Sequence, residues 1–72
     1  MIPIGRKIQS ILYERDISTQ QFERDTGIAR RIFYPRKARI HRSVLMAVAY
    51  YLEMDVEDLV EGTDAYDRWY DG

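Results

Sequence analysis

The chain has 72 residues and no cysteine, so a disulfide framework and a thiolate metal site are both excluded. Its length allows one domain with one small core, and its 46% hydrophobic and 32% charged residues are ordinary for a globular protein. No apolar run approaches the roughly 20 residues that span a bilayer, and the single histidine, His41, argues against a histidine-rich metal site.

The net charge of −1 conceals a strong asymmetry along the chain. Residues 1–42 carry ten Lys or Arg and four Asp or Glu, a net +6, whereas residues 43–72 carry one Arg and eight acids, a net −7. The densest basic stretch contains no acid and consists of Arg30, Arg31, Arg36, Lys37, Arg39 and Arg42. Asymmetry of this kind points to an anionic partner for the basic part, even though the whole chain is nearly neutral.

Two helices are predicted in the first third of the chain. Apolar residues at helical spacing indicate a helix over residues 4–15: Ile4, Ile8, Ile11 and Leu12. Ser18 and Gln21 then form a capping box, which starts a second helix at about residue 19. Gly27 ends that helix, because glycine readily adopts the left-handed conformation of a C-cap.

Two shorter segments and one long helix follow. Residues 28–34 are predicted to be a short helix, which Pro35 limits because the residue before proline avoids the helical region. The basic residues 36–41 are expected to be irregular, with His41 on the surface near the start of the next helix. That helix covers residues 42–53 and carries a core stripe: Val44, Leu45, Val48, Ala49 and Leu52.

The last predicted helix is short and is followed by an acidic, aromatic tail. Asp55 and Asp58 suggest a capping pattern for a helix that ends at Gly62. The tail covers residues 63–72, and its aromatic residues are Tyr66, Trp69 and Tyr70. Three roles for the tail remain open: it packs on the bundle, mediates dimerisation, or is disordered. Tyr50 and Tyr51 are adjacent in the chain, so at least one should leave the core, and a dimer contact is plausible there.

The order of these segments resembles a known family. Residues 17–31, Ile-Ser-Thr-Gln-Gln-Phe-Glu-Arg-Asp-Thr-Gly-Ile-Ala-Arg-Arg, are similar to the helix-turn-helix of the lambda-repressor/Cro-like (XRE) family. The run from Leu45 to Leu59 is similar to the family's fourth and fifth helices. The resemblance covers about residues 4–61 and implies an all-α fold, a compact five-helix bundle of the lambda-repressor-like DNA-binding type. We therefore divide the chain into a DNA-binding domain, residues 1–62, and the tail.

The resemblance also implies which residues meet DNA. The third helix would enter the major groove and present Ala29, Arg30, Arg31 and Tyr34. Thr19 and Gln20, at the start of the second helix, would meet phosphate. Arg36, Lys37 and Arg39 would lie along the DNA backbone and add salt-dependent affinity.

Four residues depart from the family pattern. Glu23 stands where a small residue is usual, and Thr26 stands where leucine is common. Ala29 replaces a capping serine, so the third helix should begin without a good cap. Pro35 falls inside what is usually continuous recognition helix.

Two functional hypotheses follow. The first is a cytoplasmic, sequence-specific transcriptional repressor that binds double-stranded DNA as a homodimer. The second is a protein-interaction module, an antitoxin-like or adaptor bundle that docks a partner through its C-terminal half. The sequence contains no glycine-rich phosphate loop, nucleophile elbow or ligand cluster. We therefore expect no enzymatic activity, cofactor, metal, small-molecule ligand or membrane partner.

Overall fold

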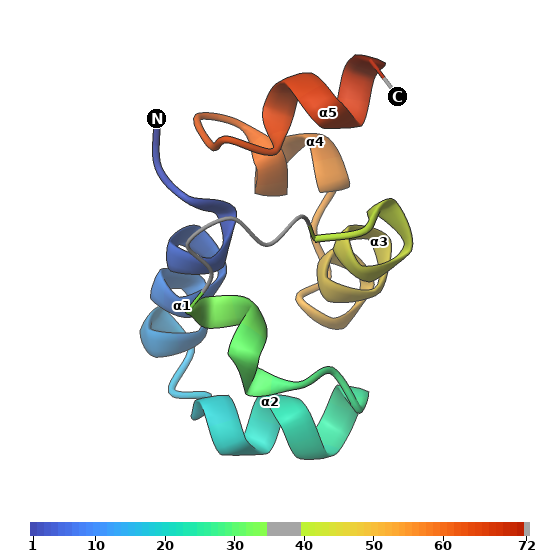
Figure 1. Ribbon diagram of the computed structural model, residues 1–72. Helices are drawn as coiled ribbons and strands as arrows, with labels where there is room; N and C mark the ends of the chain where they lie inside the picture. Colours follow the sequence, from blue (N-terminus) through green and yellow to red (C-terminus); the bar gives the residue numbers. More distant parts are fainter. Residues whose placement is uncertain (35–39, 72) are drawn as a thin grey trace.

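The computed structural model describes residues 1–34 and 40–71 (Figure 1). Its elements in chain order are α1 (Ile4–Glu14), α2 (Thr19–Thr26), the 3-10 helix η1 (Arg30–Phe33), α3 (Arg42–Tyr51), α4 (Val56–Val60) and α5 (Tyr66–Asp71). In Figure 1, η1 lies between α1 and α2, and α5 lies at the opposite end of the molecule from α2. Within the described residues no strand forms, which confirms the all-helical prediction.

The structure corrects the third helical segment and adds a helix in the predicted tail. The third helical segment is not an α-helix but four residues of 3-10 helix, a geometry common in such short pieces. Its N-cap, Ala29, makes no side-chain hydrogen bond, as its apolar side chain requires. Within the predicted tail, residues 66–71 form the helix α5. Trp69 of α5 packs against the core, so the tail contributes apolar area to a small bundle.

The local signals around α2 are confirmed. The Ser18 hydroxyl accepts a hydrogen bond from the Gln21 backbone N–H at 3.0 Å, as a capping serine does. Gly27 ends the helix with φ of 75°, a left-handed conformation that glycine adopts without steric cost. The Thr26 hydroxyl donates to the Phe22 carbonyl and accepts from the Ile28 N–H, so this departure from the family pattern fastens the turn that follows.

The cap predicted for α4 is wrong in part. Asp55 is the N-cap residue, but its side chain makes no cap hydrogen bond. The Asp55 carbonyl instead accepts the Leu59 N–H at 3.1 Å, as in any first helical turn. The stability of this short helix therefore comes from burial of Leu59 and Val60, which are both fully enclosed.

The core draws side chains from five helical elements and from three connecting segments, which lie before α3, between α3 and α4, and after α4. The buried hydrophobic residues are Ile4, Ile8, Leu12, Phe22, Phe33, Ile40, Leu45, Val48, Ala49, Leu52, Leu59, Val60 and Ala65. Phe22 contacts Phe33 with ring centroids 5.4 Å apart and Tyr51 with centroids 5.5 Å apart. Phe22 thus joins α2 to both η1 and α3 through aromatic contacts.

Gly5 allows α1 and η1 to approach each other at the level of their backbones. A Cβ atom at this position would lie 2.5 Å from the Ile32 carbonyl oxygen and 3.2 Å from the Phe33 Cα. Both neighbours are backbone atoms, so neither moves without displacing η1. The position of η1 against α1 therefore requires a residue without a side chain at position 5.

The N- and C-terminal parts of the described chain are joined. Ile2 forms a β-bridge with Thr63, and the Asp64 carboxylate accepts the Ile4 backbone N–H at 3.0 Å. Asp64 therefore caps α1 from 60 positions further along the chain. Thr63 and Ala65 are buried although they lie beyond the predicted domain boundary at residue 62. That boundary stays a prediction.

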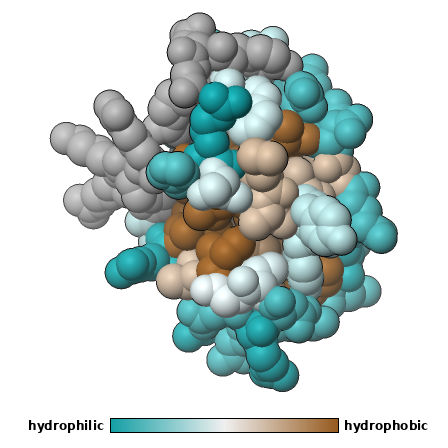
Figure 2. All heavy atoms as spheres, turned by 90° about the vertical axis from the view of Figure 1, so that its right-hand side faces the viewer, coloured by the Kyte–Doolittle hydropathy of each residue, from teal (hydrophilic) through white to brown (hydrophobic). Residues whose placement is uncertain are grey.

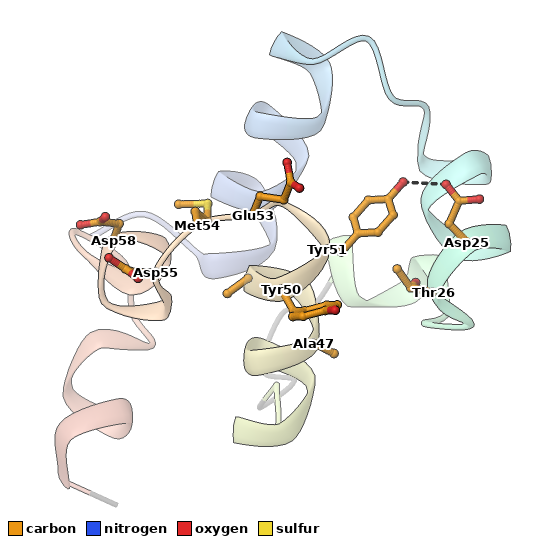
Figure 3. A pocket seen from close by; sticks show the side chains of 10 residues that line it. Asp25, Thr26, Ala47, Tyr50, Tyr51, Glu53, Met54, Asp55 and Asp58 are labelled. Carbon is orange, nitrogen blue, oxygen red and sulfur yellow. Dashed lines mark hydrogen bonds between the residues drawn. The ribbon is translucent and has the colours of Figure 1, made fainter.

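Tyr51 links α3 to α2 through its hydroxyl. The hydroxyl donates to Asp25 Oδ2 at 2.7 Å, as Figure 3 shows. This hydrogen bond, partial burial and the neighbouring negative charge together raise the pKa of Tyr51 above its ordinary value of 10.0. The contact stabilises the fold only while the phenol keeps its proton.

Replacing Gly5 by alanine should lower the free energy of unfolding by about 1–3 kcal/mol, because the added methyl overlaps the η1 backbone. Helix propensity alone predicts the opposite sign, a gain of roughly 1 kcal/mol. Urea unfolding decides between them, with Ser10→Ala on the exposed side of α1 as the control. A Gly5→Ala variant as stable as the wild type would contradict the close approach.

Replacing Tyr51 by phenylalanine should cost about 1 kcal/mol at neutral pH, the usual contribution of one hydrogen bond. Because the folded-state pKa is raised, this contribution is complete below pH 10 and disappears as the pH rises through the folded-state value. Unfolding free energies measured at increasing pH should therefore converge for wild type and Tyr51→Phe. Tyr50→Phe is the control, since Tyr50 is 87% exposed, and an equal effect of both changes would refute the assignment.

Candidate nucleic-acid interface

The predicted recognition residues lie on and beside a tight turn between α2 and η1. The left-handed Gly27 and the two hydrogen bonds of Thr26 fix the direction in which the chain leaves α2. Phe33 is buried and Ile32 is half-buried, so these two side chains anchor η1. Arg30 and Arg31 occupy the remaining positions of η1 and are exposed. The sequence therefore divides η1 into an anchored half and a half that is free to meet a ligand.

Glu23 of α2 holds the first residue of η1. Its Oε2 accepts the Arg30 backbone N–H at 3.3 Å, and its Oε1 lies 3.1 Å from the Arg30 Nε. One carboxylate thus supplies the cap that Ala29 cannot provide and also binds the side chain of the residue it caps. In the sequence Glu23 is visible only as a departure from the family pattern, because its partner lies seven residues away across the turn.

The other described residues of the predicted site are distributed around this turn. Thr19 and Ala29 are half-buried, whereas Gln20 is exposed at the start of α2. Tyr34 is 68% exposed and lines a shallow hollow together with Arg6 and Gln9 of α1. These two α1 residues lie outside the helix-turn-helix motif, and their side chains join the site only after folding. Three further predicted DNA contacts lie outside the described residues: Arg36, Lys37 and Arg39.

Several basic side chains of the N-terminal half are engaged elsewhere in the fold. The Lys7 ammonium donates to the carbonyl oxygens of Asp58 and Glu61 at the end of α4, at 2.6 and 2.7 Å. Arg15 donates to the Leu52 carbonyl at the end of α3. Both cations therefore complement the negative end of a helix dipole. Arg42 stacks over Trp69 of α5, 4.5 Å from the ring centroid.

A broad groove between α2, α3 and α4 has the opposite electrostatic character. Its carboxylates are Asp25, Glu53, Asp55 and Asp58, and Figure 3 shows how they are spread along it. Among the described residues that line the groove, none is lysine or arginine. A surface of this charge repels DNA. The groove borders the α2–η1 turn, because Thr26 at the end of α2 also lines it.

The predicted dimer residues fall into three groups. Tyr50 is 87% exposed and Tyr66 is 41% exposed. Tyr51 and Trp69 contact Asp25, Phe22 and Arg42 within the chain. Tyr70 lies in α5, and its side chain is outside the described part of the structure. His41 is on the surface as predicted, where its Nδ1 accepts the Ser43 N–H at the start of α3.

The face that contains α3 combines apolar and charged side chains. Figure 2 shows hydrophobic side chains gathered in the middle of this face and hydrophilic side chains around its rim. Met46, 58% exposed, and Tyr50 belong to α3 and project from the core.

The described residues contain no cluster of three or more potential metal ligands. In residues 1–34 and 40–71, no helix is long and apolar enough to cross a membrane.

Comparison with known proteins identifies the family. Neither a search of curated proteins nor a search of solved structures gave a significant match. A family model described as a Cro/C1-type HTH DNA-binding domain matches residues 7–64, most of the chain. The matched region includes most of α1, the α2–η1 turn, α3 and α4. The chain therefore belongs to the Cro/C1-type helix-turn-helix DNA-binding domain family.

Proposed function

We propose that the protein is a sequence-specific, DNA-binding transcriptional repressor that uses α2 and η1 as its helix-turn-helix. Family membership indicates DNA binding and transcription regulation. The observation that carries the proposal is the exposed Arg30–Arg31 pair, which lies on η1 between the left-handed Gly27 and the buried Phe33. Arginine is the side chain best suited to bidentate recognition of guanine in the major groove.

The site residues then take two kinds of role. Arg30, Arg31, Ala29 and Tyr34 face the base edges, where they determine the preferred sequence. Thr19 and Gln20 bind phosphate beside the N-terminus of α2. Arg36, Lys37 and Arg39 neutralise phosphates along the backbone and provide affinity that falls with salt. The short η1 supports a small base-specific contact, so the backbone contacts supply much of the affinity.

We further propose that two copies bind one operator. A four-residue recognition segment buries too little surface for tight binding by a single copy. The dimer contact is assigned to Tyr50, Tyr51, Tyr66, Trp69 and Tyr70, and the exposure of Tyr50 and Tyr66 supports this surface. Two-fold pairing would place the two η1 segments about 34 Å apart, one turn of DNA. The bound dimer would repress by occupying promoter DNA.

In vitro selection from a random-sequence DNA library tests the proposed function. The selected DNA should contain two half-sites related by two-fold symmetry, with centres about 10 base pairs apart. The logarithm of the binding constant should fall linearly with the logarithm of the salt concentration. A library without enriched sequences, combined with salt-independent binding, would contradict the proposal.

Arg31→Ala should reduce discrimination at one base pair of each half-site by about 1–3 kcal/mol. Lys37→Ala should instead weaken binding to all sequences alike and make the salt dependence shallower by about one unit. Titrations with the selected duplex and with single-base variants measure both effects. Glu57→Gln, on the exposed surface of α4, is the control and should leave the base preference unchanged.

A further inference from the structure

The contact between Glu23 and Arg30 fixes two parts of one residue at once. Glu23 Oε2 accepts the backbone N–H of Arg30, and Glu23 Oε1 pairs with the Arg30 Nε. The two side chains are 40% and 45% exposed, so the pair lies at the surface beside the turn. The contact therefore restricts both the start of η1 and the direction of its first side chain.

The geometry of the ion pair leaves the two terminal nitrogens of the Arg30 guanidinium available for contact with a base. A guanidinium has five N–H donors in a rigid plane, and the Arg30 Nε lies 3.1 Å from Glu23 Oε1. The four N–H donors of the two terminal nitrogens form the edge that binds the O6 and N7 atoms of a guanine. A carboxylate on Nε thus restricts rotation of the side chain without blocking that edge.

The charge of the pair has a second consequence. Glu23 places a negative charge beside the surface proposed to meet phosphates, where it weakens attraction to any DNA sequence. It also offsets the charge of Arg30, so this arginine contributes little to counterion release while the pair is intact. The ion pair therefore lowers the affinity for any DNA sequence, but it orients the Arg30 guanidinium for contact with a base.

We propose that Glu23 is a positioning residue for base recognition and holds Arg30 ready to read one guanine in each half-site. This inference rests on the proposed DNA-binding function. It assigns specificity to a residue that does not contact DNA, at a position where the family pattern has a small side chain. Arg31 has no such carboxylate support among the described contacts and reads its base with greater side-chain freedom.

The test is a double-mutant cycle on binding to two duplexes. Wild type, Glu23→Ala, Arg30→Ala and the double variant are titrated with the selected duplex and with one in which the Arg30-dependent base pair is changed. Selection with wild type and with Arg30→Ala identifies that base pair beforehand. Each titration is repeated over a range of salt concentrations, and thermal unfolding of each variant is recorded.

Glu23→Ala should reduce the preference for the guanine-containing duplex about tenfold while binding to the changed duplex stays equal or becomes tighter. The slope of log K against log salt should steepen by about one unit, because Arg30 becomes free to pair with phosphate. In the Arg30→Ala background, Glu23→Ala should leave the base preference unchanged. Glu23→Gln, whose amide oxygen still accepts the Arg30 N–H, should retain part of the preference.

Two results would overturn the inference. If Glu23→Ala weakens binding to both duplexes equally, Glu23 is only a structural cap. If it strengthens binding to both equally and keeps the base preference, Glu23 is only a source of repulsion. Glu23→Gln provides the same comparison if the alanine variant unfolds. A wild-type protein that selects no sequence would refute the proposed function. If a sequence is selected but the effects of Glu23→Ala and Arg30→Ala on base preference are additive, only this inference is refuted.

Discussion

The close approach of η1 to α1 at Gly5 is the constraint on which the recognition surface depends. A side chain at this position would overlap the backbone of Ile32 and Phe33. With no side chain there, Phe33 reaches the core and contacts Phe22 of α2. The three elements α1, α2 and η1 are therefore held by one glycine and one aromatic pair. Arg30 and Arg31 are exposed because their neighbours in the same short helix are anchored.

The structure shows what some of the basic residues in the N-terminal half contact. Part of the basic half acts within the fold: Lys7 and Arg15 bind carbonyl oxygens at the C-terminal ends of α4 and α3. Arg42 stacks on Trp69 and links α3 to α5. The positive charge proposed to face DNA is consequently smaller than the net +6 of residues 1–42. Three of the four carboxylates in the groove, Glu53, Asp55 and Asp58, come from the acidic half, and this charge repels DNA from the groove.

The sequence predicts well those features that depend on neighbouring residues. The Ser18 cap, the Gly27 turn and the apolar periodicity of α1 and α3 depend on contacts within one or two helical turns, and all are present. Features that depend on distant residues were not predictable. The Asp64 cap on α1 joins residues 60 positions apart. The role of Gly5 requires knowledge of which backbone lies opposite it.

In the candidate site, too, the sequence predicts local features but not contacts between distant residues. Arg30, Arg31 and Tyr34 were identified from the motif, and all three are exposed beside the turn. Sequence reasoning identified Glu23 as unusual but did not predict that its carboxylate would cap η1 and hold Arg30. The tail was left open between packing, dimerisation and disorder. Burial of Ala65 and the stacking of Trp69 show packing, although the contribution of the tail to a dimer stays a proposal.

The central claim is that the α2–η1 turn is the surface that meets DNA. Backbone amide NMR shifts measured during titration with a selected duplex test it most directly. The largest changes should occur at Thr19, Gln20 and residues 29–34, while the acidic groove around Glu53 and Asp58 stays unchanged. Changes that are confined to the acidic groove, with the α2–η1 turn unaffected, would contradict the account.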